Sequence, residues 1–262
     1  MNEIRFDSQG LTELPASYAG RSDITHFSVY DNRLESLPDW LWTLTGLQVL
    51  NVSVNRLTAL PDGIGELSQL RMLDAAHNPF GRLPESIGRL TNLTDFLYLS
   101  DNRLEALPES LTRLTKLRYL NVSENRLTSL PDDLGDMAGL IELRAYRNPL
   151  RSLPDSLGRL AHLRELHLDA TPLTTLPDSI GDLGALRVLS LRGCKLTHLP
   201  AALSGLARLR HLDLRDNALT DLPEAVANLP ELEKLDLRWN HELTRLPPWV
   251  AALEARGCIV YY

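Results

Sequence analysis

The sequence predicts an α/β solenoid, in which short parallel strands alternate with short helical or extended segments along one repeating array. Two observations support this prediction. Eleven Leu-Pro dipeptides recur in register along the 262 residues, with eight spacings of 23 residues and two of 24. An LxLxxN pattern precedes Leu-Pro, and eight of the eleven positions at its end are Asn. A fixed period of this length is typical of repeat architectures whose units stack on their neighbours.

The LxL part of each unit predicts one short strand. In the unit around residue 98, Leu97 and Leu99 alternate with Tyr98, so the two leucines point to one side of the strand and Tyr98 to the other. Stacked in parallel, such strands form a curved sheet whose leucine side is the core. The intervening side chains remain exposed on the other face.

The Asn at the end of each strand predicts a ladder of hydrogen bonds to the backbone. Its amide can donate to one backbone carbonyl and accept from the N–H of the next turn. A buried backbone group left unpaired would cost about 1–3 kcal/mol. Thr171 and Cys194 occupy two of these positions and can keep only part of this bonding. We therefore expect the ladder to be weakest near these two residues.

The Leu-Pro step and the PxxIGxLxx segment after it predict the return of the chain on the convex side. Five glycines of these segments suit a tight exit from that turn, namely Gly65, Gly88, Gly135, Gly158 and Gly181. Residues 247–262 begin as a repeat and end in the apolar CIVYY, which predicts a C-terminal cap. We expect a single domain, 1–262, of about eleven repeats. At the N-terminus, either the first unit is its own cap or an upstream segment or partner covers it.

The complete unit, LxxLxLxxNxLxxLPxxIGxLxx, resembles the leucine-rich repeat of the 23-residue type over essentially the whole chain. Its LPxxIGxLxxL variant is similar to intracellular plant proteins related to Ras-binding scaffolds and to animal polarity and Ras-pathway scaffolds. It is also similar to bacterial repeat proteins, including the recognition domains of secreted ubiquitin-ligase effectors. The resemblance implies a leucine-rich repeat horseshoe with a concave parallel β-sheet, and a function in binding other proteins.

Composition and charge narrow the classes of partner. The net charge of -7 and the interleaving of acidic with basic residues argue against nucleic acid. No run of 18 apolar residues occurs, so we expect no membrane partner. Two cysteines, Cys194 and Cys258, are not a disulfide framework and fit a reducing compartment. We expect a cytoplasmic protein, although secretion by a leaderless route stays open.

The motifs of common enzymes are missing from the sequence. It contains no Gly-rich phosphate loop, CxxC, HExxH or GxSxG, so we expect no enzyme activity, no cofactor and no metal. The nearest approach to a metal or catalytic cluster is a set of residues that share one face by register: His167, Asp169, His211 and Asp213. A solvated polar surface explains these residues better.

The exposed side chains of the strands fall into columns, which yield candidate partner-binding residues. Val49, Met72, Phe96 and Tyr119 follow one another in one column with Tyr98 beside them, which predicts an apolar and aromatic patch. Further along, arginines recur in another column near Trp239 and face Asp213 and Asp236. The candidates are Met72, Phe96, Tyr98, Tyr119, Arg144, Tyr146, Arg192, Arg215, Arg238 and Trp239.

One repeat within the aromatic patch has 24 residues instead of 23. Its extra residue falls between Leu93 and Leu97, just before the predicted strand. A bulge or wider turn there would re-aim Phe96 on the exposed face. Alternatively, the extra residue is an ordinary loop variation and Phe96 turns inward to fill space beside it.

The sequence therefore predicts a non-catalytic module that binds a protein ligand on its concave face, in signalling or as a bacterial effector recognition domain. The alternative is the recognition or regulatory part of a larger enzyme system, such as a ubiquitin ligase or kinase. A monomer and a weak homodimer are both compatible with the sequence.

Overall fold

Each repeat forms one strand and one short helix, as the alternation of apolar residues predicts. The computed structural model describes residues 2–262. The chain divides into two compact units: unit 1 ends at residue 127, and unit 2 comprises residues 128–262. The expectation of one domain over 1–262 stays a prediction, and the two units are described separately.

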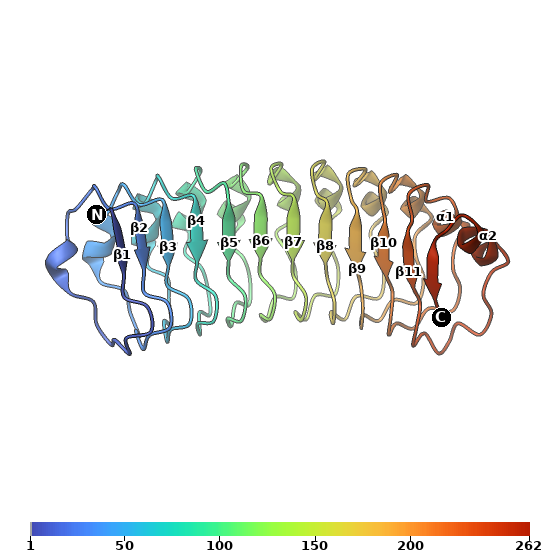
Figure 1. Ribbon diagram of the computed structural model, residues 1–262, viewed down its shortest axis with the longest axis horizontal. Coiled ribbons are helices and arrows are strands. Elements are labelled where there is room, and N and C mark those ends of the chain that lie inside the picture. The colour runs from blue at the N-terminus through green and yellow to red at the C-terminus, as the bar shows by residue number, and fades with distance from the viewer. Residues whose placement is uncertain (1) are drawn as a thin grey trace. The chain divides into compact units, whose positions relative to one another are not determined.

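The strands are three residues long, and those of each unit pair in parallel in chain order (Figure 1). Unit 1 contains β1 (Glu3–Arg5), β2 (His26–Ser28), β3 (Val49–Asn51), β4 (Met72–Asp74), β5 (Phe96–Tyr98) and β6 (Tyr119–Asn121). Unit 2 contains β7 (Glu142–Arg144), β8 (Glu165–His167), β9 (Val188–Ser190), β10 (His211–Asp213), β11 (Lys234–Asp236) and β12 (Ile259–Tyr261).

Short helices, most of them 3-10 helices, form the return segments on the other side of the core. Unit 1 contains η1 (Ala16–Tyr18), η2 (Asp39–Thr43), η3 (Asp62–Glu66), η4 (Glu85–Arg89) and η5 (Glu109–Arg113). Unit 2 contains η6 (Leu134–Asp136), η7 (Asp155–Arg159), η8 (Asp178–Asp182), η9 (Ala201–Gly205), α1 (Glu224–Ala227) and α2 (Trp249–Ala255). Most of these helices begin directly after the proline of a Leu-Pro step, where a missing N–H costs no helical hydrogen bond.

The core of each unit lies between its strands and its helices. Leu97, at the centre of β5, and the isoleucine of η4, Ile87, are both fully buried. Phe96 and Tyr98, which flank Leu97, are on the opposite side of the strand and are exposed or half-buried. We call this side of the sheet, away from the core, the open face.

The asparagine ladder is present, but its amide oxygens accept from an N–H of the preceding repeat and not, as the sequence predicts, from the next turn. Asn102 accepts from the N–H of Phe80 and donates to the carbonyls of Ala75, Leu99 and Ser100 at 3.0–3.2 Å. The bonding is reduced at Thr171 and Cys194, two of the three non-asparagine positions, as predicted. Thr171 donates to one backbone carbonyl, that of Leu168, and the Cys194 thiol donates weakly to the same carbonyl at 3.4 Å.

The glycines of the return segments have a different role from the one the sequence suggested. Their φ angles are not positive, so a left-handed turn does not require them. They lie instead against the backbone of the next repeat: a Cβ on Gly135 would stand 2.1 Å from the Ser156 carbonyl oxygen, and one on Gly88 would stand 2.4 Å from that of Ser110. These glycines allow successive helices to approach closely.

The position before the ladder residue has a left-handed backbone in all eleven repeats. Gly193 occupies it in one repeat with φ of 68°, which suits glycine. Val54 adopts φ of 54° at the same position, where a β-branched side chain is strained. The repeat geometry thus overrides the local preference of the residue.

Residues 247–262 contain α2 and β12, and β12 pairs with β11. Their role as a cap stays a prediction. Cys194 and Cys258 are both free and buried, which confirms the prediction of unpaired thiols. Within residues 2–262, no helix has the length and apolar character that crossing a bilayer requires.

Candidate functional site

Three aromatic rings are in mutual contact on the open face of unit 1. Phe96 stacks on Tyr98, with ring centroids 5.6 Å apart and planes at 12°. Tyr119, on the next strand, meets Phe96 edge-on at 5.5 Å and Tyr98 at 5.0 Å. The Met72 strand position lies directly opposite Phe96. We call these four residues the aromatic patch.

The extra residue before β5 leaves the sheet register intact. Phe96 pairs with Met72 on one side and with Tyr119 on the other, so the insertion is absorbed in a bend at Asp95 and not by a bulge in the strand. The Asp95 carboxylate is 3.2 Å from the Arg71 guanidinium of the preceding repeat. Phe96 is 41% exposed, so the alternative that it turns inward is wrong.

A hollow of about 360 Å³ lies on the open face next to the aromatic patch, and sequence reasoning did not find it. Val49 and Met72 form its apolar side, and Tyr30, which is 42% exposed, contributes an aromatic ring. Asp7 also lines it and contributes a carboxylate. Column alignment placed these residues on one face, but the hollow depends on side-chain volumes that a one-dimensional pattern does not contain.

Asp74 is a half-buried acid beside the aromatic patch. Burial raises its pKa, although the N–H of Ala76 donates to the carboxylate at 3.2 Å and favours the charged form. Asn51 and Asn121 occupy the same position on β3 and β6 and accept the corresponding backbone bond with an uncharged oxygen. The charge at Asp74 is therefore not needed for the sheet.

Arg215 and Arg238, two of the arginines predicted on the open face of unit 2, are paired with aspartates. The Arg215 guanidinium contacts the carboxylates of Asp213 and, at 3.5 Å, Asp236. Arg238 lies 2.7 Å from Asp236, which is almost fully buried. Burial acts to raise the pKa of Asp236, but hydrogen bonds from Arg238 and the charges of Arg215 and Arg238 outweigh it and hold the pKa below its usual value.

Trp239 and Arg192 are the more accessible members of this group. Trp239 is 51% exposed, and the guanidinium carbons of Arg192 and Arg238 lie 5.8 and 5.7 Å from its ring centroid. Arg238 also lies over the Tyr261 ring at 4.9 Å. These distances are within the range of cation–π attraction, so the arginines cover the aromatic rings and do not form a free row of positive charge.

Arg144 and Tyr146 lie on and after β7 in unit 2, and both are half-buried. The Arg144 Nε donates to Glu142 at 2.5 Å. His167 and His211, weighed in the sequence as parts of one polar cluster, have carboxylate neighbours of their own: Nε2 of His167 is 3.2 Å from Glu165 and that of His211 is 3.7 Å from Glu233. The roles of all ten predicted residues in partner binding stay predictions.

The comparisons with known proteins agree with the repeat pattern. The family model described as leucine-rich repeat region matches residues 61–155, and the one described as leucine rich repeat matches residues 7–80 and 186–241. No curated protein sequence matches the chain significantly.

Several solved structures have the same fold. The leucine-rich repeat ectodomain of the receptor kinase GASSHO1/SCHENGEN3 from Arabidopsis thaliana, solved with CASPARIAN STRIP INTEGRITY FACTOR 2, is 28% identical with a TM-score of 0.72. The match covers 86% of this chain and 31% of that one, so the chain spans about a third of its length. A chain of the Drosophila Toll–Spatzle complex is 26% identical with a TM-score of 0.70, over 87% of this chain and 35% of that one. A leucine-rich repeat protein of Leptospira interrogans is 26% identical with a TM-score of 0.50, over 97% and 82%.

Proposed function

The chain belongs to the leucine-rich repeat proteins, and from this premise we propose that it is a non-catalytic module that binds a protein partner on the open face of its sheet. The resemblance to the leucine-rich repeat predicts that this face is concave. The observation that carries the proposal is the aromatic patch, whose three rings contact one another on an exposed sheet surface.

The chemistry of this surface favours a partner that inserts an apolar side chain. Aromatic residues are enriched at binding hot spots because they present large contact areas with few rotatable bonds. The hollow beside Val49 and Met72 offers space for such a side chain next to the rings. We therefore propose that the partner is a protein segment with one aromatic or large aliphatic side chain. This side chain would occupy the hollow and contact the aromatic patch.

Two of the similar structures are complexes with protein ligands. One holds GASSHO1/SCHENGEN3 with CASPARIAN STRIP INTEGRITY FACTOR 2, and another is the Toll–Spatzle complex. These ligands are not assigned to this chain. They support a protein as the class of partner, with a signalling or effector role as the wider context.

A second candidate is the recognition part of a larger enzyme system. It is favoured by the similarity to the ectodomain of a receptor kinase, of which the match covers 31%. In that case the open face would keep its role in partner binding, and catalysis would belong to another domain.

The two buried free thiols fit a reducing compartment such as the cytoplasm, and we include a cytoplasmic location in the proposal.

The test begins with a photo-crosslinking amino acid placed at Phe96 and, as a matched control, at Arg113, which is exposed on η5. A protein that crosslinks at position 96 but not at 113 is then purified and titrated against the wild type. Phe96→Ala should weaken its binding by about 2 kcal/mol or more, which is roughly 30-fold, while Arg113→Ala leaves it unchanged. Unchanged affinity in Phe96→Ala and Tyr119→Ala would refute the proposal.

A further inference from the structure

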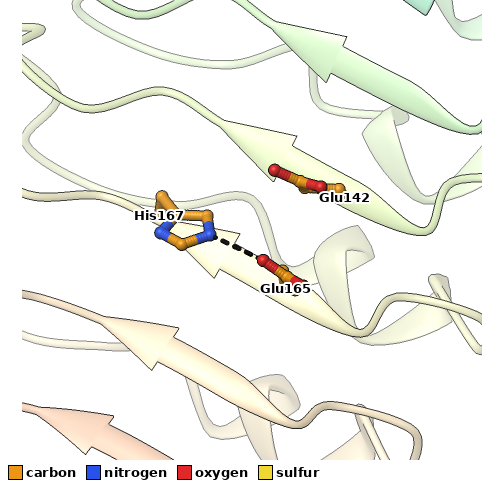
Figure 2. Close-up of side chains that lie close together, drawn as sticks. All are labelled: Glu142, Glu165 and His167. Atoms are coloured by element: carbon orange, nitrogen blue, oxygen red, sulfur yellow. Dashed lines mark hydrogen bonds and ion pairs between the residues drawn. The ribbon is translucent and has the colours of Figure 1, made fainter.

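Three side chains with metal-binding donor atoms converge on the open face of unit 2. Glu142 lies on β7, and Glu165 and His167 lie on β8. Figure 2 shows them gathered over these two adjacent strands. One ligand atom of each residue lies within 4.8 Å of those of the other two.

The strand register explains why these groups meet. Glu142 is directly opposite Glu165, and two like charges in that position destabilise a sheet. The other directly opposed pair of acids in unit 2, Asp213 and Asp236, is bridged by the Arg215 guanidinium. The same electrostatic problem at Glu142 and Glu165 makes a cation between the two carboxylates favourable.

His167 brings an imidazole close to both of these glutamates. It differs in one decisive respect from a guanidinium such as that of Arg144, which contacts Glu142. A guanidinium has only N–H donors, whereas a neutral imidazole has a nitrogen lone pair that can bind a metal. Nε2 of His167 is 3.2 Å from Glu165 Oε2. This matches the separation of about 3.4 Å between two ligands of a tetrahedral ion that is bound at about 2.0–2.1 Å.

We propose that Glu142, Glu165 and His167 bind a divalent transition-metal ion, with zinc as the best fit. Two carboxylate oxygens and one imidazole nitrogen leave a fourth position for water, a ligand set that zinc accepts. The imidazole favours zinc over magnesium and calcium, which prefer oxygen ligands alone. The side chains of Glu142, His167 and Glu165 are 19%, 20% and 41% exposed, so an ion can reach them from solvent.

Arg144 modulates this site. Its Nε donates to Oε1 of Glu142 at 2.5 Å, which orients that carboxylate and leaves Oε2 for the ion. Its positive charge also opposes a cation bound at the same carboxylate. We therefore expect Arg144→Gln to bind zinc more tightly than the wild type, an outcome that no merely structural role of the three ligands would produce.

The experiment is calorimetric titration of zinc into the full chain at pH 7.5, with magnesium as the comparison ion. We expect one zinc per chain, weakened at least tenfold by Glu142→Gln and by His167→Ala and tightened at least threefold by Arg144→Gln. His211→Ala is the matched control, because its imidazole lies near the single carboxylate of Glu233 at 3.7 Å; it should bind zinc as the wild type does.

Two further measurements keep the result interpretable. Circular dichroism of each variant verifies that it is folded, and the double variant Cys194→Ser with Cys258→Ser should keep the zinc if the thiols are not ligands. Absence of zinc binding by the wild type would overturn the proposal. So would equal affinity in Glu142→Gln, His167→Ala and the wild type, or loss of binding only in the cysteine variant.

Discussion

Replacing Cys194 by asparagine should complete the ladder at one of its two weak positions. At the equivalent position one repeat later, Asn217 accepts from the N–H of Leu196 at 3.1 Å and donates to the Leu191 and Leu214 carbonyls at 2.8 and 2.9 Å. The Cys194 thiol already points at the Leu168 carbonyl, 26 residues back. This carbonyl is equivalent to that of Leu191, to which Asn217 donates 26 residues back in the preceding repeat. Cys194→Asn should therefore fit the existing backbone.

The gain comes mainly from one backbone N–H. Leu173 is the equivalent, one repeat earlier, of Leu196, whose N–H donates to Asn217. No acceptor for the Leu173 N–H is present among residues 2–262. Leu173 is fully buried, so its unpaired N–H costs about 1–3 kcal/mol. In Cys194→Asn, loss of the buried thiol and ordering of the new side-chain amide together cost about 1 kcal/mol, which offsets part of the gain from pairing this N–H. We expect a net stabilisation of about 1 kcal/mol.

The assay is urea unfolding followed by circular dichroism, together with hydrogen exchange of the Leu173 amide, which reports on this repeat alone. Exchange at Leu173 should slow in Cys194→Asn. The mirror variant Asn217→Cys should lose about 2 kcal/mol, and Cys194→Ser, whose hydroxyl cannot accept from Leu173 in the same way, should be nearly neutral. A destabilised Cys194→Asn with unchanged exchange at Leu173 would refute the reasoning.

Four further predictions concern the backbone and two acids, Asp74 and Asp236. Val54→Gly should stabilise unit 1 by about 1 kcal/mol, because φ of 54° strains a β-branched residue; an unchanged melting temperature would contradict this. Gly135→Ala should destabilise by about 1–3 kcal/mol, since its Cβ would meet a backbone oxygen at 2.1 Å, whereas Gly184→Ala, with nothing within 4 Å, should be neutral in the same urea titration. Asp74 has a raised pKa, so its contribution to stability is present below the unfolded pKa of about 3.9 and is lost as pH rises. Between pH 4 and pH 7, the free energy of unfolding of Asp74→Asn should therefore increase relative to that of the wild type, and parallel pH curves would count against this prediction. Asp236 has a lowered pKa, so its contribution is present above about 3.9 and is lost below it; Asp236→Asn should lose less stability than the wild type on acidification from pH 5 to pH 2, and an equally steep loss would show that another acid controls the transition.

Much of the fold follows from periodicity alone. The 23-residue period places Leu97 in the core and Phe96 and Tyr98 outside it, because the alternation of a strand has a period of two. The asparagine positions specify where each strand ends, and the reduced bonding at Thr171 and Cys194 could be predicted because side-chain donors and acceptors are known from residue type. The placement of Phe96 and Tyr119 side by side on one face also follows, since adjacent strands bring column neighbours together.

The glycines of the return segments show the limit of local reasoning. Turn chemistry suggested that they relieve a tight turn, but Gly135 is required because the next repeat's backbone passes 2.1 Å from where its Cβ would be. That distance depends on how two repeats stack, which no single unit contains. The bend at Asp95 is similar: the sequence located the extra residue, while the preserved register of β5 decided that Phe96 stays exposed.

By itself, the sequence determined the repeat, the strand positions and the columns of the open face, because each depends on spacing along the chain. Only the tertiary structure decided which members of those columns touch. Arg215 and Arg238 are held by Asp213 and Asp236 in place of a free row of charge, and Glu142, Glu165 and His167 bring their donor atoms within 4.8 Å of one another. The physical reason is that ion pairs and ligand sites depend on side-chain rotamers and distances of a few ångströms, which residue order does not specify.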